Sequence, residues 1–230
     1  MHGALISLIR GVARAGLLSL LLPGASVSLA SGHLQLLDAA RNGDDESVAR
    51  LAGQAVNVDS AAADGTTALH WAAHRDDRQI AELLISAKAN VDAANDYGMT
   101  PLHLACTNRS DDLVGTLLAA GANPGAALWN GETVLMKCAR TGATEAVAAL
   151  LAKGADPNAR ENRKQQSALM WAAAEGHGEV TRLLVESGAH INTRSGGGFT
   201  PLLYAARSGD LESARALLDA GADANELPDA

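Results

Sequence analysis

The chain has 230 residues, 47% of them hydrophobic, which is enough to bury a sizeable core. Its 18 basic and 26 acidic residues give a net charge of −8, and we expect no nucleic-acid binding, because such binding depends on Lys and Arg facing phosphate. Three Trp, two Tyr and one Phe are its only aromatic residues, so the core must consist mainly of Leu, Ala, Val and Ile, which suits closely packed short helices.

The N-terminal segment differs in composition from the rest of the chain. Residues 1–37 contain no acidic residue. Arg10 and Arg14 precede an apolar run at 15–22, and small residues follow up to Ala30. This order of basic, apolar and small-residue zones is typical of a secretory signal peptide.

We therefore predict that residues 1–30 are a cleaved signal peptide and that the protein is exported, either periplasmic or secreted. The apolar run is shorter than the roughly 20 residues that span a bilayer, so we expect no stable membrane anchor after cleavage. Two alternatives stay open: an organelle transit peptide, or a short apolar helix that packs on the structure that follows.

The remainder of the chain repeats one pattern. Its Thr or Ser positions recur at intervals of 33 or 34 residues, which indicates a solenoid. The copies are GTTALHWAA (65–73), GMTPLHLAC (98–106), GETVLMKCA (131–139), QQSALMWAA (165–173) and GFTPLLYAA (198–206).

This pattern resembles the ankyrin repeat, whose T-P-L-H-x-A signature is complete at Thr100–Ala105. The resemblance implies an all-α solenoid of about six helix-turn-helix repeats with hairpin loops and a concave binding face. We expect a repeat domain over 31–230, with a degenerate capping repeat at about 33–62 and five further repeats at about 63–227. The first repeat is more polar than its neighbours. This is expected of a terminal repeat, because nothing stacks on its outer face.

Local signals support this arrangement. Thr100 can cap a helix through its hydroxyl group, Pro101 suits the first helical position, and His103 can reach back to the cap. Gly residues occupy most turn positions, but Asp76, Lys88 and Arg109 replace them in the second and third repeats. A non-Gly residue with left-handed backbone costs roughly 1 kcal/mol, so we expect this stretch to be the least stable part of the solenoid, with the fastest hydrogen exchange.

The loop 160–166 is one residue longer than its counterparts. It carries Arg160, Arg163 and Lys164, and Gln165 stands where a turn Gly is found elsewhere. We interpret it as a solvated hairpin tip, with a specific contact for acidic partner groups as the alternative.

The sequence contains no catalytic or phosphate-binding motif, so we expect neither an enzyme nor a cofactor site. His70 and His74 have a spacing compatible with a metal, but a capping role already explains His70, and we expect no metal site. Cys106 and Cys138 fall on adjacent repeats. We expect buried thiols, because packed helices lie about 8–10 Å apart whereas a disulfide needs Cα atoms within about 7 Å. In an oxidising compartment, a disulfide between them is the alternative.

The variable positions of the repeats suggest the binding surface. Trp71, Trp171 and Tyr204 share one repeat position, whereas Tyr97, Trp129 and Phe199 lie at hairpin tips. Half-buried packing between repeats remains an alternative for the first three, but we expect no aromatic residue to fill the deep core. Because aromatic and Arg residues are the usual interface anchors, we predict a protein-binding face formed by Trp71, His74, Arg75, Tyr97, Met99, Trp129, Glu132, Arg140, Phe199, Tyr204 and Arg207.

We thus expect an exported, monomeric, non-catalytic scaffold that binds another protein through its concave face and hairpin tips. Two alternatives would use the same surface: an accessory factor that protects or inhibits a cell-envelope enzyme, and a secreted effector that acts on host proteins. An enzyme is disfavoured, because a solenoid groove offers few convergent polar groups.

Overall fold

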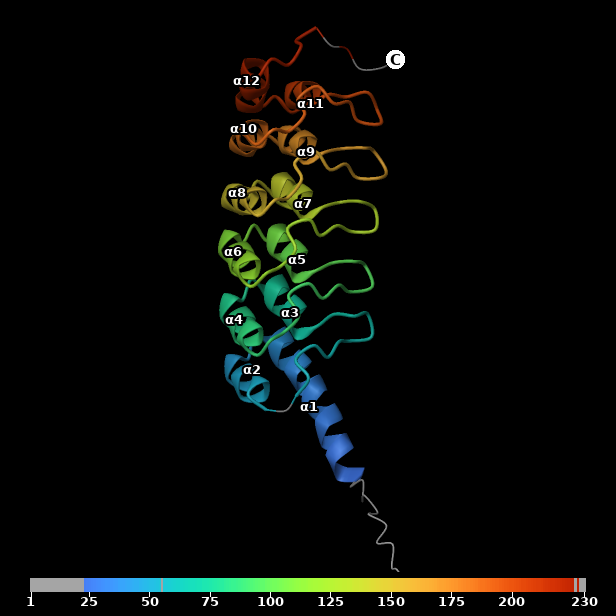
Figure 1. The fold of residues 1–230 in the computed structure, drawn as a ribbon, viewed down its shortest axis with the longest axis vertical. Helices are drawn as coiled ribbons and strands as arrows, with labels where there is room; N and C mark the ends of the chain where they lie inside the picture. Colours follow the sequence, from blue (N-terminus) through green and yellow to red (C-terminus); the bar gives the residue numbers. More distant parts are fainter. Residues whose placement is uncertain (1–22, 55, 226, 228–230) are drawn as a thin grey trace, which may run out of the picture.

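The structure is a computed structural model that describes residues 23–54, 56–225 and 227. In this part of the chain twelve helices form six consecutive pairs, stacked into an elongated solenoid (Figure 1). The predicted all-α solenoid of about six repeats is confirmed. We number the repeats 1 to 6 along the chain and call the helices of each pair its first and second helix.

The helices have closely similar lengths from repeat 2 onward. The first helices are α1 (Pro23–Asn42), α3 (Ala68–Arg75), α5 (Pro101–Thr107), α7 (Val134–Thr141), α9 (Ala168–Glu175) and α11 (Pro201–Ser208). The second helices are α2 (Asp45–Ala52), α4 (Arg78–Ser86), α6 (Asp111–Ala119), α8 (Thr144–Ala152), α10 (Gly178–Glu186) and α12 (Leu211–Asp219).

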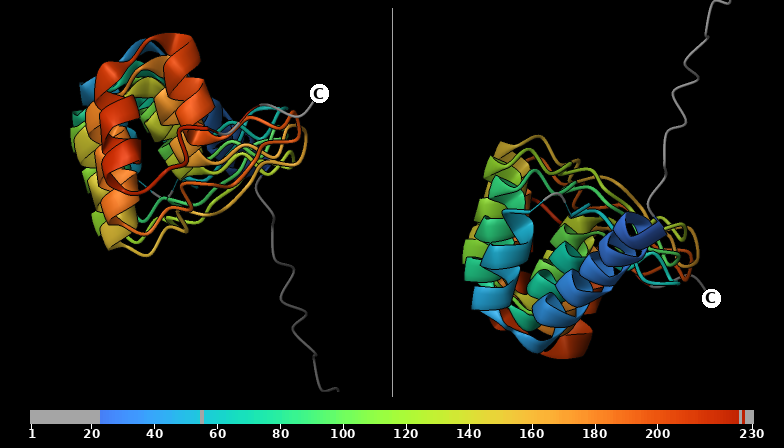
Figure 2. Two further views of the ribbon diagram at one scale, coloured as in Figure 1. Left: turned by 90° about the horizontal axis from the view of Figure 1, so that it is seen from above. Right: turned by 90° about the horizontal axis from the view of Figure 1, so that it is seen from below.

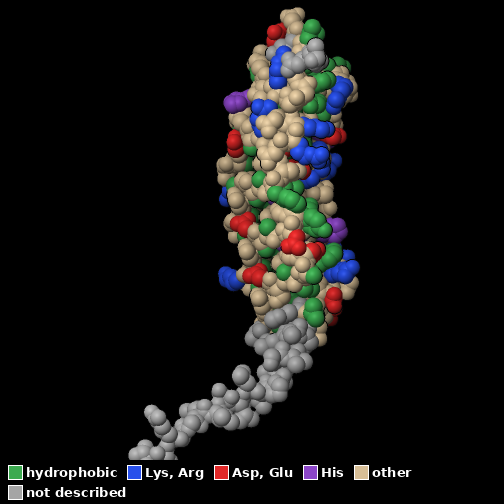
Figure 3. Space-filling view, turned by 90° about the vertical axis from the view of Figure 1, so that its right-hand side faces the viewer, with side chains coloured by type: hydrophobic (Ala, Val, Ile, Leu, Met, Phe, Trp, Pro, Cys, Tyr) green, Lys and Arg blue, Asp and Glu red, His purple; other side chains and the backbone are tan. Residues whose placement is uncertain are grey.

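Each kind of helix stacks on its own kind, so the solenoid has two helical columns, and the hairpin loops project from the column of first helices (Figure 2). Backbone hydrogen bonds join neighbouring hairpins: the N–H of Asp96 donates to the oxygen of Asp64 at 2.9 Å, and that of Asn162 to the oxygen of Asn130 at 2.7 Å. The hairpins therefore form one continuous surface, which faces the viewer in Figure 3.

The sequence determines where the first helices begin. The hydroxyl group of Thr67 accepts from the N–H of His70, and the ring Nδ1 of His70 accepts from the N–H of Thr67 at 3.1 Å. Thr100 and His103 form the same reciprocal cap. The predicted capping role of both histidines is confirmed, and it satisfies N–H groups that would otherwise be unpaired at a helix start.

The interior consists of small and branched aliphatic side chains. Each first helix from α3 to α9 contributes one Leu that is at most 1% exposed, namely Leu69, Leu102, Leu135 and Leu169. Ala residues that are fully buried beside them allow the helices to approach closely. Every repeat thus buries its apolar face only against its neighbours, as in other linear repeat proteins.

The three predicted non-Gly turn residues do adopt left-handed backbone, with φ of 57° at Asp76, 70° at Lys88 and 57° at Arg109. Gln165 does so as well, with φ of 55°. Arg109 gains a compensating contact, because its guanidinium donates to the backbone oxygen of Gly142 at 3.2 Å. That repeats 2 and 3 are the least stable remains a prediction.

Lys88 gives the cleanest test of this backbone cost. We expect Lys88→Gly to raise the free energy of unfolding by about 0.5–1 kcal/mol in urea denaturation, because Gly adopts positive φ without steric cost. The preceding residue, Ala87, has φ of −80° and is the matched control. Ala87→Gly should not raise the free energy of unfolding. At negative φ, Gly relieves no strain in the folded state and only increases the conformational entropy of the unfolded chain. Equal effects of the two substitutions would contradict this explanation.

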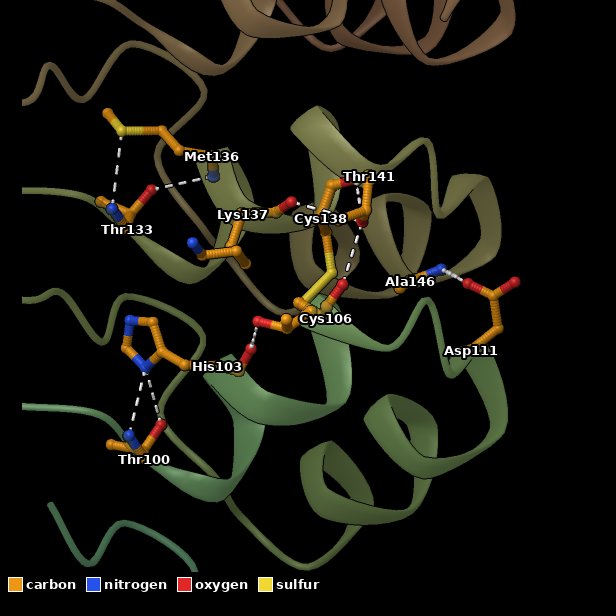
Figure 4. The surroundings of a disulfide bond; sticks show 11 residues. Thr100, His103, Cys106, Asp111, Thr133, Met136, Lys137, Cys138, Thr141 and Ala146 are labelled. Atoms are coloured by element: carbon orange, nitrogen blue, oxygen red, sulfur yellow. Dashed lines mark hydrogen bonds between the residues drawn. A yellow bond between two sulfur atoms is a disulfide. The ribbon is translucent and has the colours of Figure 1, made fainter. Parts of the chain in front are cut away.

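Cys106 and Cys138 form a disulfide between α5 and α7, with Cα atoms 4.7 Å apart (Figure 4). The expectation of two free thiols is therefore wrong. The sequence argument used the distance between helix axes, but inward-facing Cα atoms lie about 2.3 Å from each axis. An axis separation of about 9 Å thus leaves facing Cα atoms only about 4–5 Å apart.

At the N-terminus, α1 runs continuously from Pro23 through the predicted cleavage position after Ala30. The apolar run 15–22, on which the signal-peptide prediction rests, lies outside the described residues. Among the residues that the structure describes, no helix is both long and apolar enough to cross a membrane.

Candidate protein-binding surface

The hairpins and the first helices meet along the solenoid in a surface that we call the groove. It contains two pockets. The N-terminal pocket, of about 200 Å³, is lined by residues of repeats 2 and 3, which include Trp71, His74 and Leu104. The C-terminal pocket, of about 450 Å³, is lined by residues of repeats 4 to 6. Both pockets include residues from the predicted binding face.

Trp71 forms the wall of the N-terminal pocket and is half-buried. The guanidinium of Arg41, from repeat 1, lies 5.1 Å from its ring centroid, and the ring of His74 meets it edge-on at 5.9 Å. The neighbouring Arg75 is exposed and donates to the backbone oxygen of Arg41. Trp71 therefore serves both interpretations, since it packs between repeats and still presents part of its indole to the groove.

Tyr97 and Trp129 are the exposed aromatic residues of the described chain, with 60% and 79% of their surface accessible. They lie on neighbouring hairpins and touch: the indole Nε1 of Trp129 donates to the backbone oxygen of Tyr97 at 2.7 Å. Met99, at the end of the same hairpin as Tyr97, is half-buried. Tyr97 and Trp129 thus place two exposed aromatic side chains on neighbouring hairpins, with the Trp129 indole fixed by its hydrogen bond, and we call them the aromatic tip pair.

Farther along the groove, the residue before each cap pairs with the residue five positions later. In repeat 4 these are Glu132 and Lys137, whose charged groups form an ion pair of which both side chains are only 10% exposed. In repeat 5 the Nε1 of Trp171 donates to the Oε1 of Gln166 at 3.1 Å. In repeat 6 the ring centroids of Phe199 and Tyr204 lie 5.4 Å apart.

Two predicted binding residues are therefore engaged inside the protein. Glu132 is only 8% exposed because Lys137 holds its carboxylate. Tyr204 is 6% exposed, and its hydroxyl group accepts from Gln166 Nε2 at 2.8 Å and donates to Ser195 Oγ at 3.3 Å. The expectation that no aromatic residue fills the core is wrong for Tyr204.

Two arginines of the C-terminal pocket lie over aromatic rings. The guanidinium of Arg140 lies 4.9 Å from the ring centroid of Trp171. That of Arg207 lies 5.1 Å from the ring of Tyr204 and 5.5 Å from that of Phe199. Both arginines are exposed and line the pocket. In Figure 3, Lys and Arg side chains accordingly gather toward one edge of the upper, C-terminal half of the hairpin side.

The comparison with known proteins agrees with this geometry. A family profile described as "Ankyrin repeats (3 copies)" matches residues 36–127 and 135–227. The chain belongs to the ankyrin repeat family. No match was found among curated proteins. Ankyrin repeats are generally protein–protein interaction modules.

The capping histidines of these ankyrin repeats, His70 and His103, are fully buried. Their burial and hydrogen bonds determine whether a ring nitrogen can bind a metal. In His70 both ring nitrogens are engaged, Nδ1 by Thr67 and Nε2 by the backbone oxygen of Met99 at 2.9 Å. Burial lowers its pKa, although the bond to Met99 partly offsets this. His70 has no free nitrogen for a metal, and the spacing to the exposed His74 therefore carries no ligand role.

Glu161 is a residue of the C-terminal pocket that the sequence analysis did not single out. Its side chain is only 5% exposed and accepts hydrogen bonds from the backbone N–H groups of Arg163, Lys164 and Gln166 at 2.7–3.1 Å. Burial acts to raise the pKa of Glu161, but these N–H groups and the charge of Arg163 lower it overall. The loop 160–166 is thus ordered around a carboxylate. The sequence did carry a signal for this arrangement, namely Gln165 at a turn position that Gly occupies elsewhere. A non-Gly residue with left-handed backbone needs support from its surroundings, which the bonds to Glu161 supply.

Proposed function

We propose that this chain is an exported, monomeric, non-catalytic scaffold that binds another protein through its groove and hairpin tips. The observation that carries the proposal is the aromatic tip pair. Tyr97 and Trp129 are exposed, a hydrogen bond holds the Trp129 indole against the backbone of Tyr97, and Asn95 and Asn130 of the same hairpins line the two pockets. Large ordered aromatic surfaces of this kind are typical anchors of protein interfaces.

The stiffness of the scaffold supports the same function. Hydrogen bonds between hairpins, and the disulfide between α5 and α7, hold the groove in one shape before a partner arrives. Little conformational entropy is then lost when the partner binds, so more of the contact free energy appears as affinity.

The proposal of export is supported by the composition of residues 1–30 and by the disulfide, since disulfides persist mainly in oxidising compartments. N-terminal sequencing of protein from the cell envelope or the medium tests it. We expect the mature chain to begin at Ser31. Protein found only in the cytosolic fraction with Met1 present would contradict export.

Affinity capture tests the binding surface. We expect the combined change Tyr97→Ala and Trp129→Ala to weaken capture of the partner at least tenfold, since interface aromatic residues commonly contribute about 2 kcal/mol or more. The fold should be unaffected because both side chains are largely exposed.

Leu211→Ala is the matched control for capture. Leu211 is 82% exposed and apolar, but it lies at the start of the second helix α12, away from the groove. Its replacement should leave capture unchanged. A double variant at Tyr97 and Trp129 that retains the partner as well as the wild type does would overturn the surface assignment.

A further inference from the structure

The C-terminal pocket has a charge opposite to that of the whole chain. Four cationic side chains line it, those of Arg140, Arg163, Lys164 and Arg207. None of them forms an ion pair with another described residue, whereas Arg78 and Arg182, on second helices, are paired with Glu82 and Glu186. The protein as a whole carries a net charge of −8. A cluster of unpaired cations in an acidic protein needs an explanation.

The acidic residues of the lining only partly offset this cluster, since three carboxylates stand against four cations. The carboxylate of Glu132 is held by Lys137, which does not line the pocket. That of Glu161 is bound by three backbone N–H groups of its own loop. Glu175 is the remaining acidic residue of the lining. Glu132 and Glu161 are thus engaged by partners inside the protein, and four cations against three carboxylates leave the lining with a small positive formal charge.

The two arginines of the first helices are also positioned in advance. Arg140 rests on Trp171, and Arg207 rests on Tyr204. Stacking of this kind fixes the plane of a guanidinium and leaves its N–H edge free, which suits two parallel hydrogen bonds to a carboxylate. Between them in the stack, at the same repeat position, stands Ala174, whose small side chain leaves room in the pocket.

We propose that the C-terminal pocket binds an acidic segment of the partner protein, with neighbouring Glu or Asp side chains reaching Arg140 and Arg207. The inference rests on the proposed function and specifies the chemistry of the partner. Arg140 and Arg207 lie two repeats apart, or about 16–20 Å at the usual spacing of packed helices. An extended segment of about six residues covers that distance.

A peptide titration tests the proposal on the full-length mature protein. The probe is a fluorescein-labelled hexaglutamate peptide, followed by fluorescence anisotropy and by the NMR signal of the Trp171 indole N–H. We expect hexaglutamate to bind at low salt and to shift the Trp171 indole signal. Its binding should weaken as NaCl is added, because salt screens interactions between surface charges. A hexaglutamine peptide of equal length should bind at least tenfold more weakly.

Variants distinguish binding at this pocket from non-specific electrostatic attraction of the peptide to any arginine of the protein. Arg140→Gln with Arg207→Gln should weaken hexaglutamate binding about tenfold or more, whereas Arg78→Gln with Arg182→Gln, which removes the same charge from second helices, should change it less than twofold. Equal losses in the two double variants, equal binding of hexaglutamine, or tighter binding of an octathymidylate oligonucleotide would each overturn the proposal. None of these results affects capture through Tyr97 and Trp129, so the proposed function is tested separately.

Discussion

Reduction of the disulfide between Cys106 and Cys138 is expected to lower the free energy of unfolding by about 3–4 kcal/mol. The two residues are 32 positions apart, so the bond closes a loop of that size in the unfolded chain. The loss of chain entropy that a loop of this length imposes on the unfolded state gives this magnitude. For a solenoid, whose repeats are stabilised mainly by their neighbours, the loss should be concentrated around repeats 3 and 4.

Urea denaturation with and without reductant measures this effect. The double variant Cys106→Ala and Cys138→Ala is the control, because it has no thiol to oxidise and its unfolding should not respond to reductant. Both sulfur-bearing side chains are fully buried, so the bond should resist reduction until the protein unfolds. Equal stability of oxidised and reduced wild type would contradict a native disulfide at this position.

The solenoid is expected to lose stability as the pH falls from 7 to 5. Burial lowers the pKa of His103 to about 4, an effect that the backbone and the carboxylate of Glu132 only partly offset. In the unfolded chain the pKa of a His is about 6.5. The unfolded state therefore binds more protons between these values, and the contribution of neutral His103 is fully present above pH 6.5 and lost as the pH falls toward 4.

At pH 5 this difference amounts to about 2 kcal/mol for His103 alone. The lowered pKa of His70 acts in the same direction. Urea denaturation at pH 7 and pH 5 measures the loss. In His103→Gln the stability at pH 7 changes as well, but the informative quantity is the difference between the two pH values, which should shrink by about 2 kcal/mol.

His190 provides the control for this experiment. It is exposed and follows a second helix, so His190→Gln should retain the full dependence of wild-type stability on pH. The explanation fails if His103→Gln loses as much stability between pH 7 and pH 5 as the wild type does.

The fold could be predicted from the sequence because each repeat carries its own signals. Thr100 and His103 form the cap that their spacing predicts, and Asp76, Lys88 and Arg109 adopt the left-handed turns that Gly occupies elsewhere. These are local interactions within a few residues, and the period of 33 or 34 residues repeats them along the chain. Such a fold can be predicted from its sequence because the local signals all agree with the global arrangement.

The binding surface was less predictable, because it depends on contacts between repeats. The exposure of Tyr97 and Trp129 matched their position at hairpin tips, but the bond from Trp129 to Tyr97 joins residues of different repeats. Tyr204 is buried, and its hydroxyl group is bonded by Gln166 and Ser195, neither of which adjoins it in sequence.

The charge of the groove was hidden for the same reason. The sequence shows which residues are acidic or basic, but not that Glu132 is held by Lys137 or that backbone N–H groups bind Glu161. These internal partners leave Arg140, Arg163, Lys164 and Arg207 as the charged groups of the C-terminal pocket without an ion-pair partner among the described residues, beside Glu175.

Hydrogen–deuterium exchange of the mature protein, free and bound to its captured partner, tests the central claim that the groove is the binding surface. The predicted result is slower exchange on binding in the hairpins around Tyr97, Trp129 and Glu161, with α4, α6 and α8 unchanged. Slower exchange confined to those second helices, with the hairpins unaffected, would contradict it.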